Sequence, residues 1–230
     1  MVVKILRRKD ADALPYWQSF YYKGKGRVTV AQILDTLNET DDLFDTENKP
    51  APRIRWECSC MQKMCGACAM LIDGTPALAC NTFIEAEKKK TLTLAPLSKF
   101  PCVCDLVVDR SIIAEHMKAA ELWIGDRAEP SQELTGRQYE ISRCLKCGIC
   151  LEVCANYHRG EKFFGAVTAN ESWLVCSETA DETHKKAVRK AYRAHFESGC
   201  SKSLACVSNC PMHIDTLAQM AEMNRGKIKK

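Results

Sequence analysis

Fifteen of the 230 residues are cysteines, and their grouping constrains this chain more than any other feature. They form two blocks, with none between Cys104 and Cys144. Cysteine in such numbers serves secreted disulfide scaffolds, zinc sites or iron–sulfur clusters. The N-terminal sequence lacks the long apolar run of a signal peptide, so we expect a reducing compartment in which the thiols are available to metals.

The remaining composition is that of an ordinary globular protein, with 46% hydrophobic and 27% charged residues. The net charge of +4 suits an acidic partner or a membrane surface. The lysine runs at residues 88–90 and 227–230 are short and read as solvated segments, so no nucleic-acid partner is expected. No stretch approaches the roughly 20 apolar residues that span a bilayer, so any membrane connection is expected to come through another subunit.

The first block, residues 1–104, reads as a small, mostly β domain with one helix. Residues 2–7 and 16–22 are rich in β-branched and aromatic residues and predict paired strands, and residues 91–94 predict another. Thr29 with Gln32 fits a capping box at the start of a helix. Asp73-Gly74 predicts a hairpin turn between two short apolar runs.

Residues 105–230 read as helical instead. Apolar residues at helical spacing predict helices at about 112–120, 133–142 and 183–196, and another from Ile214. Gly199 is the expected C-cap of the third. The sequence thus predicts an α+β protein of two domains.

Cys60, Cys65, Cys68 and Cys80 have the C-x4-C-x2-C spacing, followed by a fourth cysteine, of a plant-type [2Fe–2S] site. Two irons need two thiolates each, and a tight loop followed by a strand supplies four. A four-cysteine zinc knot is the alternative, but a second zinc half-site is missing. A thioredoxin-like pair leaves Cys60 and Cys80 unexplained.

The second block contains C-x2-C-x2-C-x3-C and, further on, C-x5-C-x3-C-P, which together look like the two halves of a bacterial two-cluster ferredoxin. In such proteins the last cysteine of each run binds the other cluster. This rule gives one [4Fe–4S] cluster the ligands Cys144, Cys147, Cys150 and Cys210. It leaves the second cluster Cys154, Cys200 and Cys206.

The second cluster lacks a thiolate because Ser203 stands where a complete run has cysteine. A cubane with three cysteine ligands tends to lose its fourth iron, so we predict [3Fe–4S]. Ligation by the Ser203 hydroxyl is the less favoured alternative. Buried thiols or zinc ligands are the other readings of these spacings. Four cysteines remain without a predicted ligand role: Cys58, Cys102, Cys104 and Cys176.

A plant-type site followed by a two-cluster helical ferredoxin with one incomplete site resembles the iron–sulfur subunits of succinate dehydrogenases and fumarate reductases. The likeness spans nearly the whole chain, most clearly residues 65–80, 96–111 and 144–154. It implies an N-terminal β-grasp plant-type ferredoxin domain, 1–104, that faces a flavoprotein, and a C-terminal α-helical ferredoxin domain, 105–230, that rests on a membrane anchor. The chain departs from the family pattern at Ala155 and Ser201.

In that family single electrons pass between FAD on the flavoprotein, the three clusters and quinone at the anchor. The resemblance therefore implies an oxidoreductase subunit without catalytic residues of its own, peripheral to the cytoplasmic face of the cell membrane. It leaves open whether the anchor holds haem b. The competing hypotheses are a soluble relay for another flavoprotein, such as a thiol-linked fumarate reductase, and a zinc-binding structural module.

Overall fold

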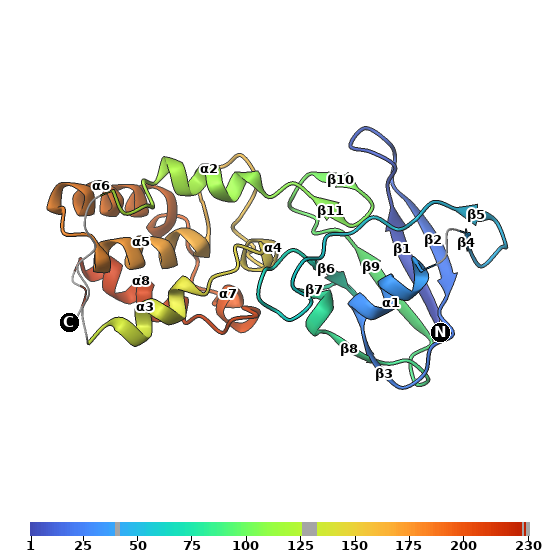
Figure 1. Ribbon diagram of the computed structural model, residues 1–230. Coiled ribbons are helices and arrows are strands. Elements are labelled where there is room, and N and C mark those ends of the chain that lie inside the picture. Colours follow the sequence, from blue (N-terminus) through green and yellow to red (C-terminus); the bar gives the residue numbers. More distant parts are fainter. Residues whose placement is uncertain (40–41, 126–132, 227, 229–230) are drawn as a thin grey trace. The chain divides into compact units, whose positions relative to one another are not determined.

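The computed structural model describes residues 1–39, 42–125, 133–226 and 228. The chain forms two compact units, Met1–Asp109 and Arg110–Lys230 (Figure 1). The first contains strands and one α-helix, and the second contains helices, which confirms the α+β class. Of the C-terminal lysines, residues 227, 229 and 230 lie outside the described residues.

The strands of the first unit form a mixed five-stranded sheet in the order β2-β1-β9-β6-β7 and three short ribbons that pair β3 with β8, β4 with β5 and β10 with β11. The elements are β1 (Val2–Arg7), β2 (Tyr16–Tyr21), β3 (Arg27–Thr29), α1 (Val30–Leu37), β4 (Leu43–Phe44), β5 (Pro50–Ala51), β6 (Ala69–Ile72), β7 (Thr75–Leu78), the 3-10 turn η1 (Ala79–Asn81), β8 (Phe83–Glu85), β9 (Thr91–Ala95), β10 (Cys102–Cys104) and β11 (Val107–Val108).

The predicted pairing of the first two strands is confirmed, with Val2 opposite Tyr21 in an antiparallel register. β1 also pairs with β9 in parallel, which local sequence patterns do not reveal. Asp73 and Gly74 both have positive φ, 49° and 78°, as the tight hairpin turn between β6 and β7 requires.

The predicted capping box at the start of α1 is present. The Thr29 hydroxyl accepts a hydrogen bond from the Gln32 backbone N–H, and the Gln32 side chain accepts one from the Thr29 backbone N–H. One face of α1 is fully buried, including Ile33 and Leu34. The core of this unit therefore consists of that face and alternate residues of the sheet.

A buried ion pair joins the start and the end of the first unit. The Arg7 Nε donates to Asp105 Oδ1 over 2.9 Å, and both side chains are almost fully buried. Asp105 Oδ2 also accepts from the Arg55 backbone N–H at 2.9 Å, and Arg7 donates to the Arg53 carbonyl. The pair thus fixes the segment that leads into the first group of cysteines.

The second unit is built around α5, which packs against α8, α6 and α3 (Figure 1). Its elements are α2 (Ser111–Ala119), α3 (Thr135–Ser142), α4 (Ile149–Glu152), α5 (Ala166–Glu178), α6 (Glu182–Tyr192), the π-helical turn η2 (Arg193–Glu197), α7 (Ala205–Ser208) and α8 (Thr216–Arg225). The predicted helices correspond to α2, α3, α6 with η2, and α8, whereas α5 was not predicted.

The predicted C-cap role of Gly199 is wrong. The helical run ends with Ser198 as its cap, and the φ angle of Gly199 is not in the left-handed range. Gly199 serves packing instead, because a Cβ there would lie 2.6 Å from the Phe163 ring. None of the helices that the structure describes combines the length and the apolar composition needed to cross a bilayer.

Candidate metal centres

The first cysteine group lies in the loop between β5 and β6 and in the 3-10 turn η1. The Cys60 Sγ accepts hydrogen bonds from the backbone N–H groups of Gln62 and Met64, at 3.5 and 3.2 Å. The Lys63 N–H, between them, points to Cys80 Sγ at 3.4 Å. The loop therefore brings Cys60 and Cys80, twenty residues apart in sequence, to a common turn of backbone.

Left-handed backbone conformations explain why these N–H groups point at sulfur. Met61 and Lys63 have φ of 54° and 61°, and Gly66 has 76°. Alternating left- and right-handed residues turn successive N–H groups to the same side of the loop, which makes an anion-binding concavity. Such donors stabilise thiolates and sulfide ions.

The four thiols divide into two pairs that differ in environment. Cys60 interacts with Cys65, and both are half-buried, whereas Cys68 interacts with Cys80, and both are buried. Backbone hydrogen bonds from Gln62 and Met64 lower the pKa of the Cys60 thiol to about 7. Burial raises the pKa of Cys68 to about 12. A metal that binds here must displace a proton from Cys68, while Cys60 is already partly ionised at neutral pH.

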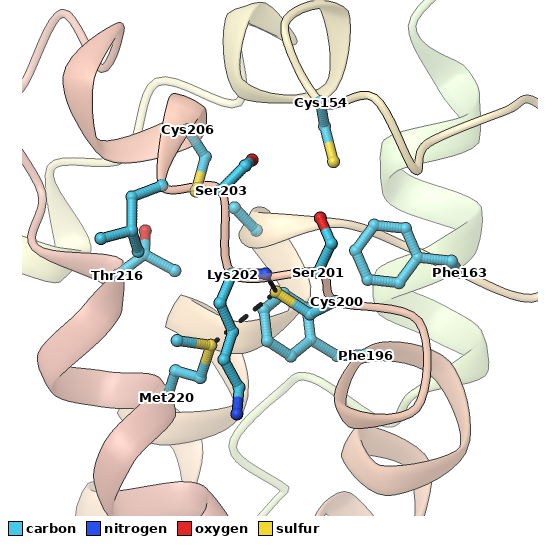
Figure 2. A pocket seen from close by; sticks show the side chains of 12 residues that line it. Cys154, Phe163, Phe196, Cys200, Ser201, Lys202, Ser203, Cys206, Thr216 and Met220 are labelled. Carbon is cyan, nitrogen blue, oxygen red and sulfur yellow. Dashed lines mark hydrogen bonds between the residues drawn. The ribbon is translucent and has the colours of Figure 1, made fainter.

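Three predicted ligands of the second unit line one cavity, shown in Figure 2: Cys154 after α4, Cys200 after η2, and Cys206 on α7. The cavity is partly open to solvent. Ser203 lines the same cavity, as the ferredoxin spacing predicts. The Lys202 N–H donates to Cys200 Sγ at 3.4 Å, and Lys202 and Leu204 both have positive φ.

The rim of this cavity includes a position where the sequence departs from the family pattern. The Ser201 hydroxyl donates to Asn156 Oδ1 at 2.8 Å, and Asn156 Nδ2 donates to the Gly199 carbonyl at 2.8 Å. These bonds connect the segment after Cys154 to the segment around Cys200. The thiols on the two segments are thereby held on facing walls.

The other four predicted ligands of this unit line a second cavity of about the same size: Cys144, Cys147, Cys150 and Cys210. Cys206 lines both cavities. Lys146 and Gly148, with φ of 50° and 87°, turn the chain between the first three of these cysteines. The Ile214 N–H donates to Cys210 Sγ at 3.5 Å. The structure therefore brings together the four thiols that the crossed ferredoxin rule assigns to one cluster.

Burial dominates the electrostatics of this cavity. It raises the pKa of Cys144 to about 11 and that of Cys150 well above its usual value. The neighbouring thiols Cys144, Cys147, Cys206 and Cys210 raise the pKa of Cys150 further. A buried set of thiols this close together stays protonated unless a multiply charged cation compensates it.

Residues on α5 contribute polar groups to this region that sequence reasoning missed. Glu171, almost fully buried, forms an ion pair with Lys146. Asn170, also buried, lines the cavity of Cys144 and donates from Nδ2 to the Thr216 hydroxyl at 3.2 Å. The available signal was the four polar residues among 168–172, but without an amphipathic pattern they did not indicate a buried helix.

The cysteines without a predicted ligand role lie elsewhere. Cys58 is exposed, and Cys176 is buried on α5 with its Sγ 3.9 Å from the Lys185 carbonyl. Cys102 Sγ lies 3.4 Å from the Asp105 carbonyl. Among the described residues, no three His, Cys, Asp or Glu side chains close around a single metal ion. The cysteines of the second unit instead line two cavities, in each of which several thiols face a common space.

Two family models match the chain. A 2Fe-2S iron-sulfur cluster binding domain matches residues 2–115, and a 4Fe-4S dicluster domain matches residues 140–214. The chain is therefore a carrier of 2Fe-2S and 4Fe-4S clusters. The two matches cover the thiol groups described above.

Curated relatives extend the similarity over the whole chain. The succinate dehydrogenase iron-sulfur subunit of Bacillus subtilis (strain 168) is 28% identical over 96% of this chain and 90% of that protein. The fumarate reductase iron-sulfur subunit of Wolinella succinogenes is 27% identical over 96% of this chain and 93% of that protein.

A solved structure shares the fold. A chain of the Mycobacterium smegmatis Sdh1 complex in the apo form superposes with a TM-score of 0.72 at 21% identity, covering 98% of this chain and 94% of that one. The two domain matches and the full-length relatives together show that the chain belongs to the family of the iron–sulfur subunits of succinate dehydrogenase and fumarate reductase.

Proposed function

We propose that the chain is the electron-transfer subunit of a succinate:quinone oxidoreductase or quinol:fumarate reductase. The observation that carries this proposal is the division of eleven cysteines into one loop and two cavities on a single chain. The clusters, when bound, exchange single electrons, whereas the interconversion of succinate and fumarate is a two-electron reaction that needs a flavin. The chain thus connects two kinds of chemistry without catalysing either.

We assign each set of cysteines to one cluster. In the N-terminal ferredoxin domain, for which the sequence predicts residues 1–104, Cys60 with Cys65 and Cys68 with Cys80 supply two thiolates to each iron of a [2Fe–2S] cluster. In the C-terminal ferredoxin domain, predicted from residue 105, the remaining ligands belong to [4Fe–4S], namely Cys144, Cys147, Cys150 and Cys210, and to [3Fe–4S], namely Cys154, Cys200 and Cys206.

Groups of the protein itself stabilise the thiolate form of these cysteines. Backbone N–H groups in left-handed turns donate to Cys60, Cys80, Cys200 and Cys210, which stabilises negative charge on sulfur. The ligand thiols of the second unit are half-buried, and burial raises the pKa of Cys150 and Cys206.

The partners follow from this role. A subunit with FAD supplies or accepts electrons at one end, and a membrane anchor that binds quinone, with or without haem b, does so at the other. The chain then lies at the cytoplasmic face of the cell membrane, attached through the anchor. We assign it no nucleic-acid partner.

Metal analysis of anaerobically purified protein tests the cluster assignment. The expected content is about nine irons, with acid-labile sulfide. Cys60→Ala should abolish the [2Fe–2S] signal in electron paramagnetic resonance (EPR) spectra, whereas the matched control Cys58→Ala should keep it. Zinc in place of iron, or loss of the signal in the control alone, would contradict the assignment.

Copurification tests the partners. Affinity purification of the chain from its native membranes should recover a subunit with bound flavin and a membrane-spanning subunit, with succinate- or quinol-dependent reduction of the clusters. Recovery of a flavoprotein from the soluble fraction, without a membrane subunit, would instead support the soluble relay.

A further inference from the structure

The two cavities of the second unit share part of one wall. Thr216, the first residue of α8, lines both of them, as does Cys206. Figure 2 shows Thr216 and Cys206 on the same side of the cavity that contains Cys154. Thr216 is 4% exposed, so its hydroxyl must find its hydrogen bonds within the protein or with a bound group.

The partner of Thr216 is an asparagine with an unsatisfied atom. Asn170, 5% exposed, donates from Nδ2 to Thr216 Oγ1 at 3.2 Å. Its Oδ1 is buried and has no hydrogen-bond partner among the described residues. An unpaired buried amide oxygen is destabilising. Asn170 also lines the cavity of Cys144, Cys147 and Cys150.

Rotation of the amide by 180° exchanges two groups that have nearly the same shape, and it lets Oδ1 pair with Thr216 while Nδ2 takes the position that has no protein partner. In the rotated form the Thr216 hydroxyl donates to Asn170 Oδ1, and Nδ2 is released with both of its hydrogens. Thiolates and inorganic sulfides accept hydrogen bonds and donate none. The released donors therefore match the chemistry of the group that four thiolates hold.

The charged side chain among the residues that line this cavity already has a counter-ion. Lys146 lines it, but its ammonium is paired with Glu171. Asn170 is uncharged and adds donors without adding a second ion to be desolvated. This makes it suited to tune the site and not to bind a ligand of its own.

We propose that Asn170 donates a hydrogen bond to the sulfur atoms of the [4Fe–4S] site and that Thr216 is the positioning residue that holds the amide in this orientation. The inference rests on the ligand assignment proposed above. Reduction adds one negative charge to a sulfur-rich group, and an N–H donor stabilises that charge. Asn170 should therefore raise the reduction potential of this cluster.

The test is a redox titration of the assembled complex, followed by EPR, with iron and sulfide content measured on the same samples. Asn170→Leu keeps the volume and removes the donors. It should reduce the equilibrium constant for reduction of the [4Fe–4S] cluster by about tenfold, or 59 mV for one electron. The [2Fe–2S] potential should not change.

Three further variants distinguish an effect of the hydrogen bond on the reduction potential from general damage to the fold. Thr216→Val should shift the [4Fe–4S] potential in the same direction by less, and Thr216→Ser, which keeps the hydroxyl, should restore the wild-type value. Ser172→Ala is the matched control on α5, because Ser172 is buried with an unpaired hydroxyl but lies outside the described linings of both cavities. It should leave the potential unchanged.

A fully loaded Asn170→Leu protein with the wild-type potential would overturn this inference and leave the proposed function intact. If that variant fails to load, the Thr216→Val protein decides, and an unchanged potential there has the same meaning. Wild-type protein without iron and labile sulfide would overturn the proposed function itself.

Discussion

The two units complete their interiors in different ways. In the first, the sheet and α1 bury apolar side chains such as Val3, Ile5 and Leu34 fully, and two of the predicted ligands, Cys68 and Cys80, are buried as well. In the second, seven half-buried cysteines line two cavities. The first unit therefore has an apolar core of its own, whereas in the second we infer that the cofactors fill space between the helices.

The thiols of the two units also differ in their chemistry. In the first unit backbone N–H groups lower the pKa of Cys60, although burial raises that of Cys68, whereas in the second unit burial raises the pKa of Cys150 and of its neighbours Cys144 and Cys147. Metal binding at the buried site must therefore supply the energy that keeps several thiolates together. Because the unfolded chain has no such site, this binding energy becomes folding energy. The second unit should depend on its metal far more than the first.

Cys150→Ala should have the largest effect. Loss of this buried ligand should abolish the [4Fe–4S] signal and with it the folding free energy of the second unit, about 5–15 kcal/mol for a domain. Hydrogen exchange should show α5 unprotected while β1 stays protected. Cys176→Ala is the matched control: it removes a buried cysteine of α5 outside both described cavity linings and should cost about 1 kcal/mol. Protection of α5 that survives in Cys150→Ala would refute the idea that the cofactor completes this core.

The cysteine spacing predicted which cysteines line each cavity of the second unit. The sequence also predicted the five strands of the main sheet and the helix α1 of the first unit, but not the six strands of its short ribbons. Its strands alternate, its turn at Asp73-Gly74 needs positive φ, and its helix begins with a capping box, so each signal is local. The pairing of β1 with β9 is not local, because strands almost ninety residues apart leave no mark on each other's pattern.

The helix α5 was missed for a different physical reason. It is buried on nearly all sides, so it has no polar face, and polar residues such as Asn170 and Glu171 are tolerated inside because Thr216 and Lys146 pair with them. Periodicity reports an amphipathic surface and is silent about a buried polar network. The predicted ligands lie in cysteine motifs that can be recognised locally, whereas Asn170 and Glu171 gave no such local signal.

Asp105→Asn should have the next largest effect, and in the first unit. It leaves the Arg7 guanidinium buried without its counter-ion, which costs about 3–5 kcal/mol. Chemical denaturation should show earlier unfolding of β1, with loss of the [2Fe–2S] signal in the same transition. Glu47→Gln breaks an exposed pair with Lys49 in the same unit and should change stability far less. Equal effects of the two substitutions would show that the buried pair does not hold this unit together.

The two units should also differ in how acid affects their stability, because all five histidines follow residue 115. His116 is buried against Phe164, with ring centroids 3.9 Å apart, and burial lowers its pKa to about 4. The unfolded state, with a pKa near 6.5, binds the proton more tightly. The contribution to stability is therefore complete above pH 6.5 and declines by up to about 3 kcal/mol as the pH falls to 4.

His116→Phe keeps the ring stack and should reduce this loss of stability between pH 6.5 and 4, measured by thermal unfolding of the second unit. The exposed His158 provides the control, since His158→Gln should leave the pH profile unchanged. An acid transition of the same size in both variants would assign it to other groups.

Ser203→Cys should have the smallest effect on stability and the most specific effect on composition. Ser203 lines the cavity with Cys154, Cys200 and Cys206, so the substitution places a fourth thiol where the ferredoxin pattern expects one. The protein should gain about one iron, and the EPR signal of the oxidised [3Fe–4S] cluster should disappear as a four-iron cluster forms. Ser201→Cys is the matched control, because Ser201 lines the same cavity but its hydroxyl is bound to Asn156. An iron gain in Ser201→Cys but not in Ser203→Cys would contradict this prediction. The fourth iron would then lie next to residue 201, and the cluster would be oriented differently from that of a ferredoxin.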